Sequence, residues 1–319
     1  MRSSSFAKHL SDAGKSVWDR LPVRLRERRP VVVAGSWIHK LALRLSGRSQ
    51  SESTWFLRNE PLLLTIRDVV SDNFKYSEAV RLCVVGCGSG AEIHSVLWTL
   101  RRARRDLRIL PIGIDISSSA IAKAKTRTFT LEDAELAGGF LQSRREPILS
   151  EESMAELFDR DGESLRVKDW IASGVQWEIG DARDPAVLEK FVLQDVVIAN
   201  NFLVHMKEQE ATACLRNILQ LVKPGGFFIC RGVDLDIRER AARQFRLSPI
   251  QLRIEEIHGA APDLDARRYW PWKYYGLEPL DKRRRNWVQR YASVFQVPKE
   301  SQGSFRAMGK AAGAAGSKS

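Results

Sequence analysis

Three glycines at alternate positions follow a short apolar run. Gly86, Gly88 and Gly90 lie between the strand-like residues 81–85 and a helical pattern that starts at Ala91. Glycine adopts backbone angles that a Cβ atom forbids, and it lets a ligand approach the backbone closely. A strand, a glycine loop and a helix in this order predict a nucleoside site beside the helix N-terminus. Because Gly86-x-Gly88-x-x-Ala91 also fits a dinucleotide fingerprint, the loop alone leaves the ligand open.

Two acidic residues that follow later apolar runs supply hydrogen-bond acceptors. Asp115 ends the second run, where its carboxylate could accept two hydrogen bonds from a ribose diol, and Ile116 is assigned to the same site. Asp181 follows the third run beside the small Ala182, and it could accept a hydrogen bond from an adenine amino group. These positions predict a bound nucleoside, but they suit a nicotinamide cofactor and an adenosyl-methionine cofactor equally.

Two further segments separate these cofactors. Asn200 and Asn201 end the fourth apolar run and are assigned to the cofactor site. The run 223–226, Lys-Pro-Gly-Gly, predicts the end of a helix with a left-handed glycine cap before the fifth strand. The glycine loop, the ribose acid, Asp-Ala and this stop, in this order and spacing, resemble the S-adenosylmethionine-dependent methyltransferases of class I. A nicotinamide oxidoreductase is the outside alternative, and a non-enzymatic binding module is disfavoured because the cofactor motifs are intact.

Strand-like and helical patterns alternate around these residues. Alternation of this kind predicts an α/β fold, a Rossmann-like class I methyltransferase with a mostly parallel seven-stranded sheet and helices on both faces. The expected strands are 81–86, 108–114, 175–179, 195–199, 227–230 and 291–297, and the expected helices are 62–70, 91–105, 117–125, 185–191 and 207–223.

The segment 126–174 interrupts the alternation. It is far longer than the ~2–6 residues of an ordinary α/β loop, so we expect an inserted subdomain. Helical patterns at 131–137 and 151–158 and a turn at 159–162 lie within it. Insertions of this kind commonly carry substrate selection.

A narrower resemblance begins before the sheet. Thr54-Trp-Phe-Leu-Arg58 resembles the Thr-x-Phe-Phe-Arg segment of the chemotaxis-receptor glutamate methyltransferases, the CheR family. Residues 87–95, 158–168 and 200–206 are similar to three later segments of that family, and the whole resemblance covers about 51–235. It implies an S-adenosylmethionine-dependent methyltransferase whose acceptor is a carboxylate, the glutamate side chain of a protein.

The resemblance also implies roles for single residues. Thr54 and Arg58 would lie at the cofactor, with Arg58 near the methionine carboxylate or the acceptor, and Glu92 would meet the methionyl amino group. This chain departs from the family at three positions expected to face the acceptor, where Asn200 replaces an arginine and His94 and His205 replace tyrosines. These changes motivate an alternative, an O- or N-methyltransferase of a small molecule, glycan or lipid-linked substrate.

His205 is the candidate base. A carboxylate acceptor needs no base, whereas a hydroxyl or amine acceptor does, and His205 is positioned to reach either. Arg58 and His205 are therefore the predicted catalytic residues. A histidine at a helix start that only bonds to backbone explains the position equally well, so both interpretations stay open.

The net charge of +12 is concentrated at the two ends of the chain. Residues 1–50 carry +8 and residues 266–319 carry +9, whereas 51–265 carry −5. This distribution argues against a nucleic-acid groove through the core and allows basic ends that contact an anionic surface. A helix over 36–47, with Trp37 and Leu41 on an apolar face, is expected to pack on the domain, and a membrane-surface helix is the alternative.

The segment 267–275 interleaves aromatic and basic residues and precedes the basic run 282–285. Such a segment can stack on nucleobases or sugars or form a lid or a dimer surface, but packing onto the sheet is expected because large aromatic side chains are mostly buried. The predicted organisation is a basic, partly helical arm at 1–50, a methyltransferase domain at 51–297 and a disordered tail at 298–319.

Composition limits the remaining classes. The chain has four cysteines, too few for a disulfide framework, and they lack the partners of a metal site, so no metal is expected. It has no 18-residue apolar run, and its first residues lack the apolar stretch of a secretory signal. We therefore expect a cytoplasmic enzyme without a transmembrane segment, with S-adenosyl-L-methionine as cofactor and a protein or small molecule as methyl acceptor.

Overall fold

The computed structural model describes residues 14–26, 28–48, 54–137, 149–260 and 269–299. The chain forms two compact units. The small unit comprises residues 1–49 and 261–285, and the sheet unit comprises 50–260 and 286–319. The structure thus groups 261–285 with the N-terminal residues, whereas the sequence prediction placed them in the methyltransferase domain. The predicted disorder of the tail falls almost entirely on residues outside the described ranges.

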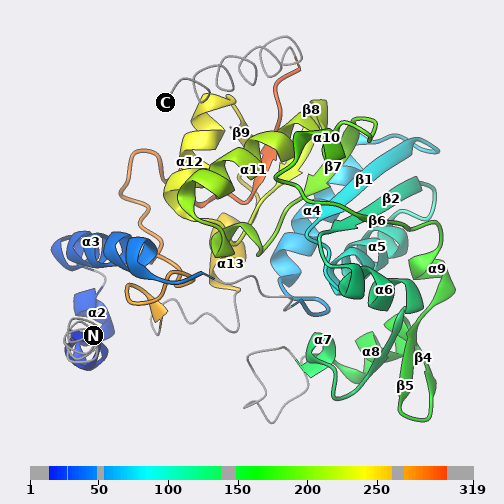
Figure 1. Ribbon diagram of the computed structural model, residues 1–319, viewed down its shortest axis with the longest axis horizontal. Coiled ribbons are helices and arrows are strands. Elements are labelled where there is room, and N and C mark those ends of the chain that lie inside the picture. The colour runs from blue at the N-terminus through cyan, green and yellow to red at the C-terminus, as the bar shows by residue number, and fades with distance from the viewer. Residues whose placement is uncertain (1–13, 27, 49–53, 138–148, 261–268, 300–319) are drawn as a thin grey trace. The chain divides into compact units, whose positions relative to one another are not determined.

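A seven-stranded sheet in the order β6-β2-β1-β7-β8-β10-β9 forms the centre of the sheet unit (Figure 1). Its strands are β1 Ala79–Val85, β2 Arg108–Asp115, β6 Gln176–Ile179, β7 Gln194–Ile198, β8 Val222–Ile229, β9 Ser248–Pro249 and β10 Val294–Gln296. The pairs among β6, β2, β1, β7 and β8 are parallel, and β10 is antiparallel to both β8 and β9. The order changes direction at β1, so the loops after β1 and β7 diverge and open a crevice at the carboxyl ends of the strands. This topology confirms the predicted mostly parallel α/β sheet.

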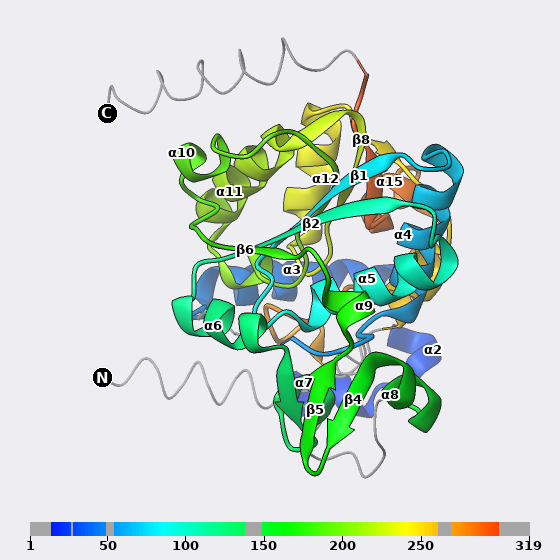
Figure 2. The ribbon, with the colours of Figure 1, turned by 90° about the vertical axis from the view of Figure 1, so that its right-hand side faces the viewer.

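Helices cover both faces of the sheet (Figures 1 and 2). Helices α4 Glu60–Asn73, α5 Ala91–Ala103 and α6 Ser118–Thr126 lie on one side, and α10 Pro185–Leu188, α11 Glu208–Gln220 and α12 Leu235–Gln244 lie on the other. Val80, Leu82 and Val84 of β1 join a core cluster that includes α4 and α5. The intervening Cys83 is also buried. The four successive residues 82–85 of β1 are buried, which is typical of a strand in a sheet covered on both faces.

Three more short helices and a 3₁₀ helix belong to the sheet unit. They are the short α9 Asp169–Ala172, α13 Ile254–Gly259 and α15 Trp287–Tyr291, together with the 3₁₀ helix η2 Leu203–His205. Arg290 of α15 is buried and forms ion pairs with Asp236 and Glu239 of α12, both at 2.8 Å. The expected strand at 291–297 is therefore shorter, because its first residue still belongs to α15.

The predicted helix stop at 223–226 is wrong. Helix α11 ends at Gln220, and the Lys-Pro-Gly-Gly run already lies within β8. Gly225 has a left-handed φ of 77°, and its N–H donates a hydrogen bond to the Val297 carbonyl. The pairing of β7 with β8 is irregular at the same place, between Gln194 and Val196. The glycines therefore form an irregular start of the strand rather than a helix cap.

The insertion contains a small antiparallel sheet in the order β3-β5-β4, which Figure 2 shows below the large sheet. Its strands are β3 Thr128–Thr130, β4 Phe158–Asp161 and β5 Ser164–Val167, and it also contains α7 Ala134–Ala137 and α8 Glu151–Leu157. The rings of Phe129 and Phe158 both pack edge-on against Phe56 in the main core. The helical patterns at 131–137 and 151–158 are confirmed only over α7 and α8, and the hairpin β4–β5 was not predicted.

The small unit is built around two tryptophans that are far apart in the sequence. Trp18 and Trp270 meet edge to face with ring centroids 5.5 Å apart, and both are buried together with Val32. Val32 lies on α3 Arg29–Leu45, which follows the short α2 Val23–Arg26. The helix starts at Arg29, because Pro30 suits a first helical turn, and not at Ser36 as predicted. Of the aromatic segment 267–275, the described residues pack within this unit and not onto the sheet.

Candidate active site

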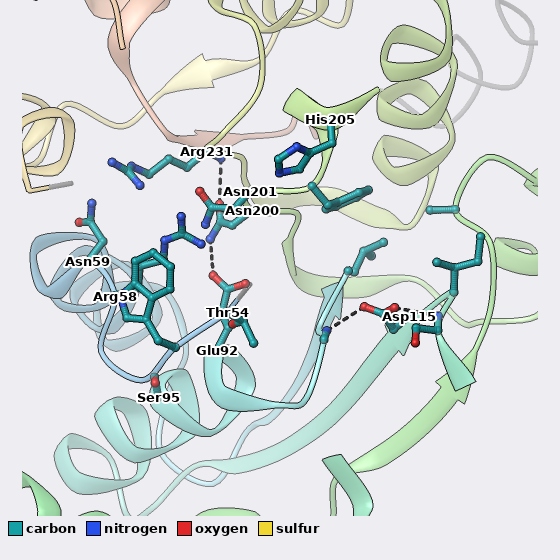
Figure 3. A pocket seen from close by; sticks show the side chains of 18 of the residues that line it. Thr54, Arg58, Asn59, Glu92, Ser95, Asp115, Asn200, Asn201, His205 and Arg231 are labelled. Carbon is teal, nitrogen blue, oxygen red and sulfur yellow. Dashed lines mark hydrogen bonds between the residues drawn. The ribbon is translucent and has the colours of Figure 1, made fainter. Parts of the chain in front are cut away.

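A cavity of about 300 Å³ lies in the sheet unit at the carboxyl ends of the central strands (Figure 3). It is lined by every predicted site residue except Gly90: Thr54, Arg58, Gly86, Gly88, Glu92, Asp115, Ile116, Asp181, Ala182, Asn200, Asn201 and His205. Gly90 is the N-cap of α5 with a left-handed φ of 90°, so it contributes to the backbone turn of the loop without lining the cavity. Residues that were predicted from several different sequence motifs therefore line one cavity.

The glycine loop follows β1 and is held by Asp115 from the neighbouring strand. Gly86 has a φ of 70°, and a Cβ atom there would lie 2.6 Å from the Phe202 ring. The N–H of Gly88 donates to Asp115 Oδ2 at 2.7 Å, and the N–H of Ser117 donates to Asp115 Oδ1 at 2.9 Å. A carboxylate has about four acceptor sites, so Asp115 retains acceptor capacity toward the cavity.

A polar cluster occupies the opposite side of the cavity (Figure 3). Asn200 Nδ2 donates to Glu92 Oε1 at 2.6 Å. The Asn200 Oδ1 atom accepts from the backbone N–H of Arg231 at 2.8 Å. These two bonds fix the orientation of the Asn200 amide and hold the Glu92 carboxylate at the cavity wall.

Burial raises the pKa of Glu92, against the opposing effects of the Asn200 hydrogen bond and the charges of Arg58 and Arg231. A buried carboxylate is costly when it is ionised without a cationic partner. An ammonium group in the cavity would favour the ionised form by direct attraction. Glu92 therefore has the chemistry expected of a group that binds an amine.

Arg58 is positioned by a turn between the start of the sheet unit and α4. Its guanidinium lies 3.7 Å from the centre of the buried Trp55 ring, a cation–π contact. The next residue, Asn59, caps α4 by accepting a hydrogen bond from the Leu62 N–H and donates to the Ile257 carbonyl. The turn thereby holds Arg58 at the cavity wall.

Asp181 lines the cavity in a different state from Asp115. Its carboxylate pairs with the Arg183 guanidinium, with Oδ2 2.7 Å from Nη2, and also accepts the Arg183 N–H at 2.9 Å. These contacts lower the pKa of Asp181, with the Arg183 hydrogen bond as the main cause. The predicted contact to an adenine amino group would have to share this carboxylate with Arg183.

The two histidines singled out in the sequence have different surroundings. His205 ends η2 and lines the cavity, close to Asn201 in Figure 3. His94 is fully buried on α5 against the Trp177 ring, and neither ring nitrogen has a hydrogen-bond partner among the described residues. Burial lowers the pKa of His94 to about 3, so its ring is neutral. The prediction that His94 faces the acceptor is wrong, because its side chain points into the core.

The structure adds lining residues that sequence reasoning missed. Arg231 is the most informative, because it is almost fully buried and brings a second guanidinium to the Glu92 side of the cavity. Its carbonyl accepts the Asn201 N–H at 2.7 Å, and Asn201 has a left-handed φ of 63°. The residue after Arg231 is Gly232, and a Cβ atom at this position would clash with the Asn201 Cα at 2.6 Å, so the close approach requires glycine. Arg231 comes directly after the fifth predicted strand, and that position at the carboxyl edge of the sheet was a usable signal.

The cavity fits S-adenosylmethionine in the chemistry of its walls. Asp115 faces the cavity beside a glycine loop that leaves room for a nucleoside, and Glu92 suits the methionyl ammonium. The guanidiniums of Arg58 and Arg231 suit a carboxylate. Among the described residues, no three His, Cys, Asp or Glu side chains gather to hold a metal ion, and the four cysteines are free thiols. No helix in the described ranges is long and apolar enough to cross a membrane.

Comparison with known proteins identifies a family. The family model of the CheR methyltransferase SAM-binding domain matches residues 52–240. None of the curated proteins compared with the chain matches it. The match confirms the predicted resemblance, the S-adenosylmethionine cofactor and the class of enzyme.

Solved structures with similar folds are distant. The chain is 18% identical to the magnesium protoporphyrin IX methyltransferase of Synechocystis PCC 6803 with bound SAM, over 60% of this chain and 71% of that one, with a TM-score of 0.33. It is 18% identical to SAM-bound CalS10, an amino pentose methyltransferase from Micromonospora echinaspora, over 60% and 55%, with a TM-score of 0.30. It is 19% identical to the DszA carbon methyltransferase, over 53% of this chain but only 32% of that one, with a TM-score of 0.33. The fold assignment therefore rests on the strand order and the family match.

Proposed function

Because the chain belongs to the CheR methyltransferase family, we propose that it transfers a methyl group from S-adenosylmethionine to a carboxylate, by family resemblance a glutamate side chain of a protein. The bound cofactor supplies an electrophilic methyl group on a sulfonium. A carboxylate acceptor would take this methyl group by in-line displacement, with the neutral thioether of the cofactor as the leaving group. This displacement needs no base, so the residues of the site act mainly by positioning the acceptor and excluding water.

One observation carries the choice of a carboxylate: two guanidiniums, those of Arg58 and Arg231, line the same cavity as Glu92. The amino-acid end of the cofactor carries one ammonium and one carboxylate. Glu92 would pair with the ammonium, and one guanidinium would pair with that carboxylate. The other guanidinium adds a second positive charge to the wall of the same cavity, and this charge favours an anionic acceptor.

A second candidate function rests on His205. This histidine lines the cavity where the family has a tyrosine, and a neutral imidazole there could remove a proton from a hydroxyl or an amine. The alternative is therefore an O- or N-methyltransferase of a small molecule, glycan or lipid-linked substrate. In either case we propose that His205 touches the acceptor and that Thr54, Asp115 and Asn200 belong to the cofactor site.

The stability of the product to alkali distinguishes the two functions. The purified protein is incubated with cell lysate and S-adenosylmethionine labelled in the methyl group, and the protein, lipid and small-molecule fractions are then treated with mild alkali. A carboxyl methyl ester releases volatile methanol, whereas a methyl ether or methylamine does not. Label in protein that alkali releases supports the proposal, and alkali-stable label in another fraction supports the alternative.

Variants test the residues. Arg231→Met should lower the rate of methyl transfer by about a hundredfold, because a buried charged hydrogen-bonding partner of an anion is lost. Arg105→Met, an exposed arginine away from the cavity, is the matched control and should leave the rate unchanged.

His205→Ala should lower kcat in both functions, but it should abolish the pH dependence of kcat only if the histidine acts as a base. Full kcat in this variant on the true acceptor would refute its contact with the acceptor.

A further inference from the structure

Helix α3 of the small unit exposes an apolar face. Val33, Trp37, Leu41 and Leu45 follow one another at intervals of four residues, so they form one stripe along the helix. Their exposed fractions are 49%, 73%, 56% and 73%. Other exposed large apolar side chains of the described residues, such as Tyr76 and Val192 in the sheet unit, do not form such a run along a helix. A continuous exposed stripe of this kind marks an interaction surface.

The opposite face of the same helix is anchored. Val32 and Gly35 are buried, with Val32 packed in the cluster of Trp18 and Trp270. His39 Nδ1 lies 3.1 Å from the Pro271 carbonyl oxygen. The helix therefore has a fixed orientation within the small unit, and the apolar stripe is not a frayed segment that could turn inward.

Basic residues border the stripe. Arg29, Lys40 and Arg44 are exposed on one side of it, and the Lys40 ammonium lies 5.9 Å from the centre of the Trp37 ring. The helix contains no acidic residue. The small unit as a whole carries 18 Lys and Arg against 7 Asp and Glu, a net charge of +11. The partner of this face must therefore accept apolar side chains and carry negative charge.

We propose that the exposed face of α3 docks the protein on an anionic lipid bilayer. A tryptophan and leucines with a basic border are the composition of helices that lie in the interface of a membrane, where the apolar side chains enter the acyl boundary and the basic groups meet anionic headgroups. At 17 residues with two cations in its second half, α3 is too short and too charged to span a bilayer. A second copy of the chain would bring the same positive charge to the face. A nucleic acid could stack a base on Trp37, but it has no surface that buries the valine and leucine side chains of the stripe.

Flotation with vesicles tests the proposal. The full-length protein is mixed with vesicles of phosphatidylcholine alone or of phosphatidylcholine with phosphatidylglycerol, and the bound fraction is measured against lipid concentration. Binding should require phosphatidylglycerol and should weaken as salt is added. Absence of binding to the mixed vesicles, or equal binding to both kinds, would overturn the proposal.

Two variants separate the apolar and the basic contributions. The apolar variant carries W37S, L41S and L45S, and its matched control carries Y76S, V192S and L252S in exposed positions of the sheet unit. The basic variant carries R29Q, K40Q and R44Q, and its control carries R105Q, K125Q and K190Q. Each α3 variant should weaken binding to the mixed vesicles by more than about tenfold, because it removes three cations from the headgroup region or three apolar side chains from the acyl boundary at once. Both controls should bind like the unaltered protein.

Outcomes that fail to separate the variants from their controls count against the proposal. If α3 variants and controls bind alike, the basic surface acts without this helix. If the unaltered protein is a dimer that only the apolar variant dissociates, with vesicle binding unchanged, the face joins two copies instead. Because S-adenosylhomocysteine binding to the sheet unit is measured on the same samples, a failure of the docking proposal is distinguishable from a failure of the proposed methyl transfer.

Discussion

The two units of this chain divide charge and cavity between them. The small unit carries +11, and its described core is a cluster around two tryptophans, whereas the sheet unit carries +1 and buries a core that extends over most of its strands and helices. Every residue that lines the cavity belongs to the sheet unit. The net charge of +12 is therefore carried mainly by the small unit and says little about the chemistry of the cavity.

The largest effect that tests this division is the removal of Trp270. Trp270→Ala should destabilise the small unit by about 3–5 kcal/mol, because Trp270 is the centre of its described core. Hydrogen exchange of residues in α3 measures the loss. The affinity for S-adenosylhomocysteine, measured by calorimetry, should stay within about twofold, and a large fall would show that the cavity depends on the small unit.

The buried His94 gives the sheet unit an acid-sensitive core. Its pKa is lowered to about 3 in the folded state, so the folded protein resists the protonation that the unfolded chain undergoes near pH 6.5. The stabilisation is complete above pH 6.5 and is lost as the pH falls toward 3. Between pH 6.5 and 4.5 the free energy of unfolding should fall by about 2.5 kcal/mol more in the native protein than in His94→Phe.

Urea unfolding at several pH values measures this difference. The comparison uses the change with pH within each protein, so a general loss of stability from the larger ring cancels. Parallel pH profiles for the two proteins would contradict the neutral, unbonded state of His94.

Glu92→Gln should weaken S-adenosylhomocysteine binding by about thirtyfold, or about 2 kcal/mol, because an ionic hydrogen bond to the ammonium becomes a neutral one. Calorimetry measures the affinity, and 5′-methylthioadenosine, which lacks the amino-acid end, is the matched ligand and should lose little. Burial raises the pKa of Glu92, so its carboxylate is protonated at a higher pH than an ordinary carboxylate. As the pH is lowered, the affinity of the native protein should therefore begin to fall at a higher pH than it would with an ordinary carboxylate at this position. Equal losses for both ligands would place Glu92 away from the ammonium.

The smallest effect is expected at Asp181. Its carboxylate is partly exposed and already paired with Arg183, so Asp181→Asn should weaken S-adenosylhomocysteine by no more than about threefold. Asp115→Asn is the contrasting variant, because Asp115 also accepts the N–H groups of Gly88 and Ser117, and it should lose more than about tenfold. Similar losses at the two positions would make Asp181 an equal partner in cofactor binding.

Local patterns sufficed for much of the site. The glycine loop directly follows β1, and Asp115 is the last residue of β2. A parallel sheet brings the carboxyl ends of its strands to one edge. The expectation that these residues share a site follows from that rule alone. His94 shows its limit, because a position on a helix near the loop does not reveal which face the side chain takes.

The sequence by itself determined the class of fold, the family and the motif residues that line the cavity, because these depend on short-range periodicity and on motifs within single segments. Tertiary structure alone decided three other points. The Lys-Pro-Gly-Gly run joined β8 because Gly225 bonds to Val297, 72 residues later, and Trp270 packed with Trp18 rather than on the sheet. Arg231 entered the cavity because β8 ends beside β7. Each of these three contacts depends on a residue that is distant in the chain. The local sequence does not specify which distant residue will supply the hydrogen bond or the apolar contact.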